Sequence, residues 1–122
     1  MTRVMVVDDS RVSRMMIRNK IETLRPGWTL VEAASGEDAL AQAQGQAPDH
    51  VTMDLNMAGM NGFEAAERLL ALCPGVKIAL LTANIQESSR ERAQRLGVLF
   101  VAKPVTDAAV LAVVGHFESS AP

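Results

Sequence analysis

The sequence has few features that would place the protein outside the cell or in a membrane. Its one cysteine, Cys73, cannot form an internal disulfide, which favours a reducing compartment. The apolar run before the first aspartates, Val4 to Val7, is too short for a signal peptide or a membrane span. The net charge is −2 with both signs interspersed, so no basic surface suggests nucleic acid. These absences predict a cytoplasmic protein without nucleic-acid binding or membrane insertion.

The sequence instead shows a regular alternation of strand-like and helix-like segments. With 122 residues, 48% of them hydrophobic, the chain fits one compact domain. Short apolar runs predict strands over residues 3–7, 29–33, 50–54, 77–81 and 99–102. Helices are predicted from the N-cap Ser10 to about residue 25, and over 37–43, 62–72, 87–96 and 107–117. Five such βα units predict a doubly wound parallel sheet with right-handed crossovers.

Polar or charged residues stand where four of the predicted strands end. They are Asp8, Asp9, Asp54, Thr82 and Lys103. Ligands of open α/β sheets bind outside the carboxyl ends of the strands, so we expect these side chains to converge. Two carboxylates about 5 Å apart repel by roughly 3 kcal/mol at an effective dielectric constant near 20. The cluster therefore predicts a lysine and a hard divalent cation, Mg²⁺ or Mn²⁺, as the compensating charges. The alternative for the first pair is helix capping alone.

These motifs together resemble the receiver domain of two-component response regulators, in particular its stand-alone, chemotaxis-type members. The resemblance covers essentially the whole chain and rests on "VDDS", "MDLNMAGMNG", "IALLTAN" and "LFVAKP". It implies a flavodoxin-like α/β fold with a five-stranded parallel sheet in the order 2-1-3-4-5 and five helices. It also implies a receiver domain over residues 1–118 and a short tail, 119–122, with no output domain.

The resemblance assigns the acidic residues to phosphoryl transfer. Asp54 matches the phosphoacceptor of the family. Asp8 and Asp9, with Asp54 and the backbone carbonyl of Asn56, match the ligands of the metal ion.

A second set of residues matches the positions that sense the phosphoryl group. Thr82 corresponds to the switch hydroxyl, Phe100 to the switch aromatic and Lys103 to the lysine of the site. The bond between Lys103 and Pro104 is expected to be cis.

Four positions bear on the details of the implied mechanism. Asn56 and Asn84 occupy positions that modulate how water reaches the phosphoryl group, and so its lifetime. Ala58 replaces a proline that is frequent in the family, and Phe100 lacks the hydroxyl of the tyrosine often found there. Outputs that require that hydroxyl are therefore not expected of this chain.

The implied function is signalling rather than enzymatic turnover. The domain would take its phosphoryl group from a histidine kinase or a histidine phosphotransfer protein. It would signal to a downstream protein through its fourth helix, fifth strand and fifth helix, catalysing only its own phosphorylation and autodephosphorylation. One alternative is a constitutive, phosphorylation-independent binding module. A haloacid dehalogenase-like phosphohydrolase is disfavoured, because its Asp-x-Asp motif lies on the first strand, which here ends in Asp-Asp.

Three further groups of residues remain. A basic group on the first helix could be a solvated face or a docking surface: Arg11, Arg14, Arg18 and Lys20. Five methionines are predicted to fill the core: Met15, Met16, Met53, Met57 and Met60. His50 and His116 have no ligand-like neighbours and are not predicted to bind a metal.

Overall fold

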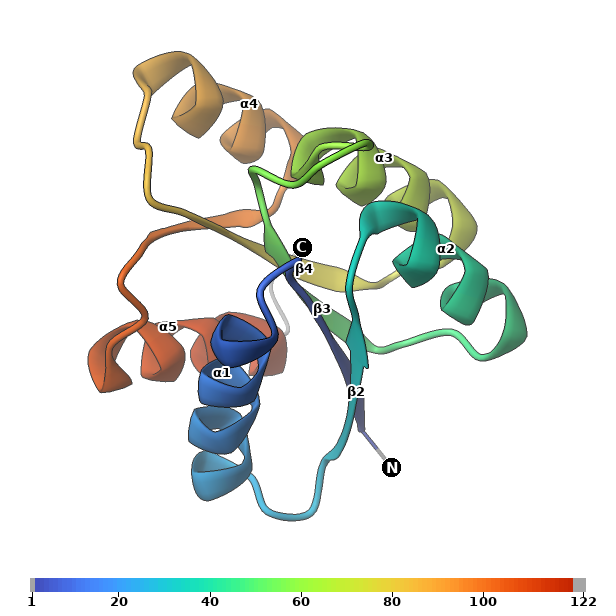
Figure 1. Cartoon of the computed structure of the whole chain (residues 1–122), viewed down its shortest axis with the longest axis vertical. Helices are drawn as coiled ribbons and strands as arrows, with labels where there is room; N and C mark the ends of the chain where they lie inside the picture. Colours follow the sequence, from blue (N-terminus) through green and yellow to red (C-terminus); the bar gives the residue numbers. More distant parts are fainter. Residues whose placement is uncertain (1, 120–122) are drawn as a thin grey trace.

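Strands and helices alternate along the chain in the computed structural model, which describes residues 2–119 (Figure 1). The elements in that range are β1 (Arg3–Val7), α1 (Arg11–Leu24), β2 (Thr29–Ala33), α2 (Gly36–Gly45), β3 (His50–Asp54), α3 (Gly62–Leu72), β4 (Lys77–Thr82), α4 (Glu87–Leu96), β5 (Leu99–Ala102) and α5 (Asp107–Glu118). All neighbouring strand pairs are parallel, in the order β2-β1-β3-β4-β5. The predicted flavodoxin-like α/β class and the predicted strand order are confirmed.

The sheet lies between two layers of helices and divides the hydrophobic core in two. Figure 1 shows α1 and α5 together on one face of the sheet and α2, α3 and α4 on the other. Successive side chains of a strand point to opposite faces. Accordingly, Met5 and Val7 of β1 belong to the core under α2 and α3, whereas Val4 and Val6 belong to the core under α1 and α5. Both faces of the central strands are therefore buried, as their continuous apolar runs predict.

Side-chain caps fix where most of the helices begin. Ser10, Ser35, Asn61 and Thr106 each accept a hydrogen bond from the backbone N–H three residues later, at the starts of α1, α2, α3 and α5. The predicted cap at Ser10 is therefore present. None of the helices within residues 2–119 combines the length and apolar character that crossing a bilayer requires.

A close backbone contact places the start of α3 against the end of β3. A Cβ atom at Gly62 would lie 2.6 Å from the backbone oxygen of Asp54 and 2.7 Å from the Cα of Leu55. Only glycine fits there without a backbone shift, because the neighbouring atoms are main chain. The "MNG" turn thereby holds α3 directly behind Asp54.

The prediction that all five methionines fill the core is wrong for two of them. Met53 and Met57 are buried, but the side chains of Met15 and Met16 are 51% and 48% exposed. The reason is the helical period, because α1 turns Ile17 and Ile21 toward the sheet and Met15 and Met16 away from it.

The C-terminal boundary of the domain stays a prediction. Helix α5 ends at Glu118 and is followed by its C-cap, Ser119. The rest of the predicted tail, residues 120–122, lies outside the described residues.

Candidate functional site

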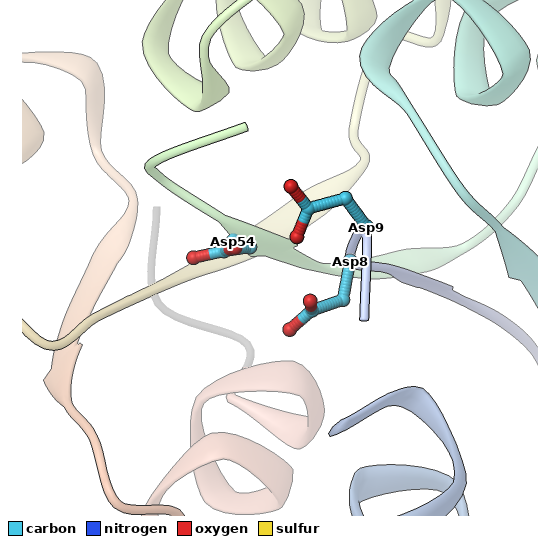
Figure 2. A group of neighbouring side chains, drawn as sticks. All are labelled: Asp8, Asp9 and Asp54. Carbon is cyan, nitrogen blue, oxygen red and sulfur yellow. The ribbon is translucent and has the colours of Figure 1, made fainter. Parts of the chain in front are cut away.

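Three carboxylates meet at the carboxyl edge of the sheet, as their positions after the strands predict. Asp8 and Asp9 follow β1, and Asp54 is the last residue of β3, its neighbour in the sheet. Each offers an oxygen that lies within 4.8 Å of an oxygen of the other two. Figure 2 shows the three side chains side by side. Asp8 and Asp54 are buried, whereas Asp9 is exposed to solvent.

The buried Asp8 is held by hydrogen bonds from three directions. Its Oδ1 accepts from the backbone N–H of Ser10 at 2.9 Å, and its Oδ2 accepts from the Ser13 hydroxyl at 2.7 Å. The Lys103 ammonium donates to the same Oδ2 at 3.0 Å. The Arg14 guanidinium also donates to the backbone oxygen of Asp8 at 2.7 Å. These contacts satisfy a buried charge that would otherwise be very unfavourable, and they fix its position.

Lys103 joins the carboxylates of β1 and β3. Its Nζ lies 3.0 Å from Asp8 Oδ2 and 3.5 Å from Asp54 Oδ1. Burial acts to lower the pKa of Lys103, but the hydrogen bond with Asp8 and the charges of Asp54 and Asp8 together raise it above its ordinary value. The peptide bond from Lys103 to Pro104 is cis, as expected. Lys103 is thus a fixed positive charge within the acidic cluster.

The electrostatics of Asp54 reflect this crowding. Burial and then the nearby charge of Asp8 raise the pKa of Asp54 above its ordinary value. The charge of Lys103 and a hydrogen bond from the backbone N–H of Asn56 oppose this rise without cancelling it. The cluster contains three carboxylates, and one lysine lies within 4 Å of two of them. A cluster of hard oxygen donors with surplus negative charge is suited to a divalent cation such as Mg²⁺ or Mn²⁺.

The hydroxyl of Thr82 lies at the end of β4, next to this cluster in the sheet order. Thr82 is fully buried. Its Oγ1 accepts hydrogen bonds from the backbone N–H of Asn84 at 3.1 Å and from the side-chain amide of Asn56 at 3.2 Å, and its hydroxyl donates to the Asn84 carbonyl at 3.3 Å. The main chain of Thr82 also contacts the residue that follows β5, because the backbone N–H of Lys103 donates to the Thr82 carbonyl at 2.8 Å.

Both the sequence and the fold are similar to those of known proteins. The family model of the response regulator receiver domain matches residues 4–115. The chain belongs to the response regulator receiver family. The chemotaxis protein CheY of Thermotoga maritima is 34% identical over 104 residues, which are 84% of this chain and 85% of CheY. Protein CcdB of Bacillus subtilis is 37% identical over 118 residues, 95% of this chain and 97% of CcdB.

A solved structure gives the same result for the fold of this receiver domain. The chemotaxis protein CheY4 of Vibrio cholerae superposes with a TM-score of 0.82 at 27% identity, covering 94% of this chain and 97% of CheY4.

Phe100 lies on the edge strand β5 of the receiver domain. Its ring is partly buried against the core under α2 to α4. It pairs with Leu80 in the sheet, two residues before the pair of Thr82 and Ala102. On its outer side, the guanidinium carbon of Arg90 from α4 lies 5.8 Å from the ring centroid. Phe100 is therefore placed between the strand that carries Thr82 and the surface of α4.

The basic group on α1 is mostly engaged in ion pairs. Arg14 and Arg18 both pair with Glu32 of β2, at 2.9 and 3.0 Å. Hydrogen bonds from these two arginines lower the pKa of Glu32. Lys20 pairs with Asp107 at the start of α5. Three of the four basic residues are thus engaged in ion pairs within the domain, and two of them share one carboxylate.

Sequence reasoning missed two side chains that support Asp8. Neither Ser13 nor Arg14 was singled out for a contact with the acidic cluster. Ser13 lies three residues after the Ser10 cap, in the first turn of α1, and that position could have predicted that it faces the end of β1.

Proposed function

We propose that this receiver domain accepts a phosphoryl group on Asp54 from a phosphohistidine of a histidine kinase or a histidine phosphotransfer protein. The position of the Asp54 carboxylate carries the proposal. Its Oδ1 lies 3.5 Å from Lys103 Nζ, and oxygens of Asp8 and Asp9 lie within 4.8 Å. A nucleophilic oxygen thus stands beside a fixed positive charge and a group of metal-ligand oxygens. Phosphoryl transfer depends mainly on such positioning and charge compensation.

The residues present fit a hard divalent cation. Asp8, Asp9 and Asp54 would hold Mg²⁺ or Mn²⁺, and the backbone carbonyl of Asn56 would supply a further oxygen. The fit rests on three carboxylate donors within 4.8 Å of one another, one of them open to solvent, which suits a cation that keeps several waters. When bound, the cation would neutralise charge on the transferring phosphoryl oxygens.

The transfer is a displacement at phosphorus. An oxygen of Asp54 attacks the phosphorus and forms a P–O bond, while the P–N bond of phosphohistidine breaks and its electron pair returns to the imidazole nitrogen. Lys103, a point charge on a flexible stem, can then pass from Asp54 Oδ1 to a phosphoryl oxygen.

The output would be a population shift in the surface formed by α4, β5 and α5. The Thr82 hydroxyl would turn to donate to a phosphoryl oxygen, and the Phe100 ring would move into the space behind it. The contact of Arg90 with the Phe100 ring supports the link from β5 to α4. Such a change biases a bistable surface toward a downstream partner. Because the CheY relative is a chemotaxis protein, a chemotaxis-type pathway is the first setting to test.

The phosphodonor would dock on an apolar patch of α1 rather than on its basic residues. Val12, Met15 and Met16 are 61%, 51% and 48% exposed. Val12 and Met16 also line a groove of about 230 Å³ that includes Lys103 and Pro104 at the phosphorylation site. Contiguous exposed apolar groups are typical of protein contact sites. Their position allows a donor bound there to present its phosphohistidine to Asp54.

Intact-mass measurement after incubation with acetyl phosphate or phosphoramidate tests the proposal. We expect the wild-type protein to gain one phosphoryl group only when Mg²⁺ is present. Asp54→Asn, which keeps the shape of the side chain but removes its nucleophilic charge, should gain none. Asp107→Asn is the matched control, because it removes a carboxylate at the highly exposed start of α5 and should be phosphorylated like the wild type.

The other outcomes are equally informative. Phosphorylation of Asp54→Asn would place the acceptor on another residue. Absence of any gain in the wild type, with either donor and with Mg²⁺, would favour the constitutive binding module.

A further inference from the structure

A side chain from the loop after β3 holds the Thr82 hydroxyl. Asn56 Nδ2 donates to Thr82 Oγ1 at 3.2 Å, and the backbone N–H of Asn84 donates to the same oxygen at 3.1 Å. The hydroxyl hydrogen is directed to the Asn84 carbonyl at 3.3 Å. A hydroxyl has one donor and two acceptor sites. In this arrangement all three are in use, and none is left for a phosphoryl oxygen.

The same asparagine also contacts the phosphoacceptor. The backbone N–H of Asn56 lies close enough to the Asp54 carboxylate to lower the pKa of that carboxyl. Asn56 therefore touches the carboxylate through its main chain and the Thr82 hydroxyl through its side chain.

We propose that the side-chain amide of Asn56 is a positioning group that holds Thr82 in the unphosphorylated arrangement and thereby sets how readily the domain switches. The proposal rests on the proposed function, because it deepens the regulation of the same site. Phosphoryl oxygens are charged acceptors, and hydrogen bonds to them are roughly twice as strong as those between neutral groups. A phosphoryl group on Asp54 would thus take over both the Asn56 amide and the Thr82 hydroxyl.

The size of the effect follows from the loss of one neutral hydrogen bond. Asn56→Ala removes the hydrogen bond from the Asn56 amide to Thr82, which exists only in the unphosphorylated arrangement. The switched arrangement lacks this bond and therefore does not lose it. We therefore expect the ratio of switched to unswitched protein, without any phosphoryl group, to rise about threefold to tenfold. Asn56 is exposed, so the substitution leaves no cavity and should not unfold the domain.

Methyl NMR of the full chain measures this ratio directly. The methyl groups of Thr82, Leu81 and Val101 report on the end of β4 and on the facing residues of β5. Spectra of the wild type with and without beryllofluoride and Mg²⁺, a stable mimic of the phosphoryl group, define the two end points. The spectrum of Asn56→Ala is then recorded without either addition. Asn19→Ala is the matched control, because it makes the same substitution at an exposed position of α1.

We expect all three methyl signals of Asn56→Ala to move along the lines that join the wild-type end points, and those of Asn19→Ala to stay at the unphosphorylated positions. A shift of Thr82 alone, or none, would overturn the role of Asn56, because a change confined to the surroundings of the Thr82 hydroxyl does not move Leu81 and Val101 along the same lines. If beryllofluoride and Mg²⁺ do not shift the wild-type signals, the proposed function fails instead. The two failures are thus distinguished by the wild-type spectra.

Discussion

The glycine at the start of α3 offers a test of how the fold positions Asp54, the proposed phosphoacceptor. In Gly62→Ala the new Cβ would lie 2.6 Å from the backbone oxygen of Asp54 and 2.7 Å from the Cα of Leu55. Ordinary contacts of this kind need about 3.5 Å, so α3 and the end of β3 must separate by nearly 1 Å. Overpacking of this kind destabilises by about 1–3 kcal/mol, and we expect the upper end because both neighbours are main chain.

A second glycine provides the matched control. At Gly115 in α5 an added Cβ meets no heavy atom within 4 Å. Gly115→Ala should therefore stabilise the domain by about 0.5–1 kcal/mol, since alanine loses less conformational entropy in a helix. Urea unfolding followed by the fluorescence of Trp28, the one tryptophan, gives both free energies.

The same variants connect stability with function. Displacement of Asp54 by a large fraction of 1 Å should slow phosphorylation by acetyl phosphate in the folded Gly62→Ala protein by at least about tenfold. Gly115→Ala should be phosphorylated at the wild-type rate. A Gly62→Ala protein as stable as Gly115→Ala and phosphorylated equally fast would refute the reasoning that α3 is held directly against Asp54.

Two further predictions concern pH. Burial and the charge of Asp8 raise the pKa of Asp54, so its ionised form opposes folding above that pKa and ceases to do so as the pH falls. In thermal melts with EDTA, the free energy of unfolding of Asp54→Asn should thus exceed that of the wild type by about 1 kcal/mol at pH 7, and the difference should shrink in acid. An equal difference at pH 7 and in acid would contradict this reasoning. Burial lowers the pKa of His50 below its ordinary value of 6.5, although the charge of Asp49 opposes the shift. The folded protein therefore favours the neutral imidazole, and this contribution to stability is present above pH 6.5 and is lost as the pH falls below it. The His50 ring stacks on the Phe117 ring with the centroids 4.6 Å apart, and His50→Phe should keep an aromatic ring in that place. Between pH 6.5 and about 5 this variant should lose less stability than the wild type, and equal losses would exclude His50 as a cause.

The strands and the approximate location of the site could be predicted because short-range signals determine them. Apolar runs bounded by turn residues indicate buried strands, and the carboxyl-end rule then brings Asp8, Asp54 and Lys103 to one edge. The N-cap at Ser10 was predictable for the same reason, since its signal lies within one turn of the helix. In these cases the residues that determine the structure lie within a few positions of one another in the sequence.

The burial of side chains on α1 and the contacts of loops could not be predicted in this way. Helix α1 has more apolar residues than one face can bury, and the choice of Ile17 over Met16 for the core depends on the angle at which α1 packs on the sheet. The bond from Asn56 to Thr82 joins residues 26 positions apart and depends on the rotamer of a loop side chain. The ion pairs of α1 could not be predicted either, because their acidic partners lie on β2 and α5 and come close only in the folded domain.

The hydrogen-bond pattern indicates a division of roles among the three aspartates of the cluster. The oxygens of Asp8 already accept from Ser10, Ser13 and Lys103, so most of its acceptor capacity is used within the protein, and one of these bonds holds the lysine in place. Asp9 is exposed, and within residues 2–119 no hydrogen bond to its carboxylate is recorded, so its oxygens are available to a cation and its waters. Asp54 has its carboxylate 3.5 Å from Lys103 and its main chain against Gly62. We infer that Asp8 positions the lysine, Asp9 binds mainly the cation, and Asp54 is left as the nucleophile, so substitution of Asp8 should disturb Lys103 more than substitution of Asp9 does.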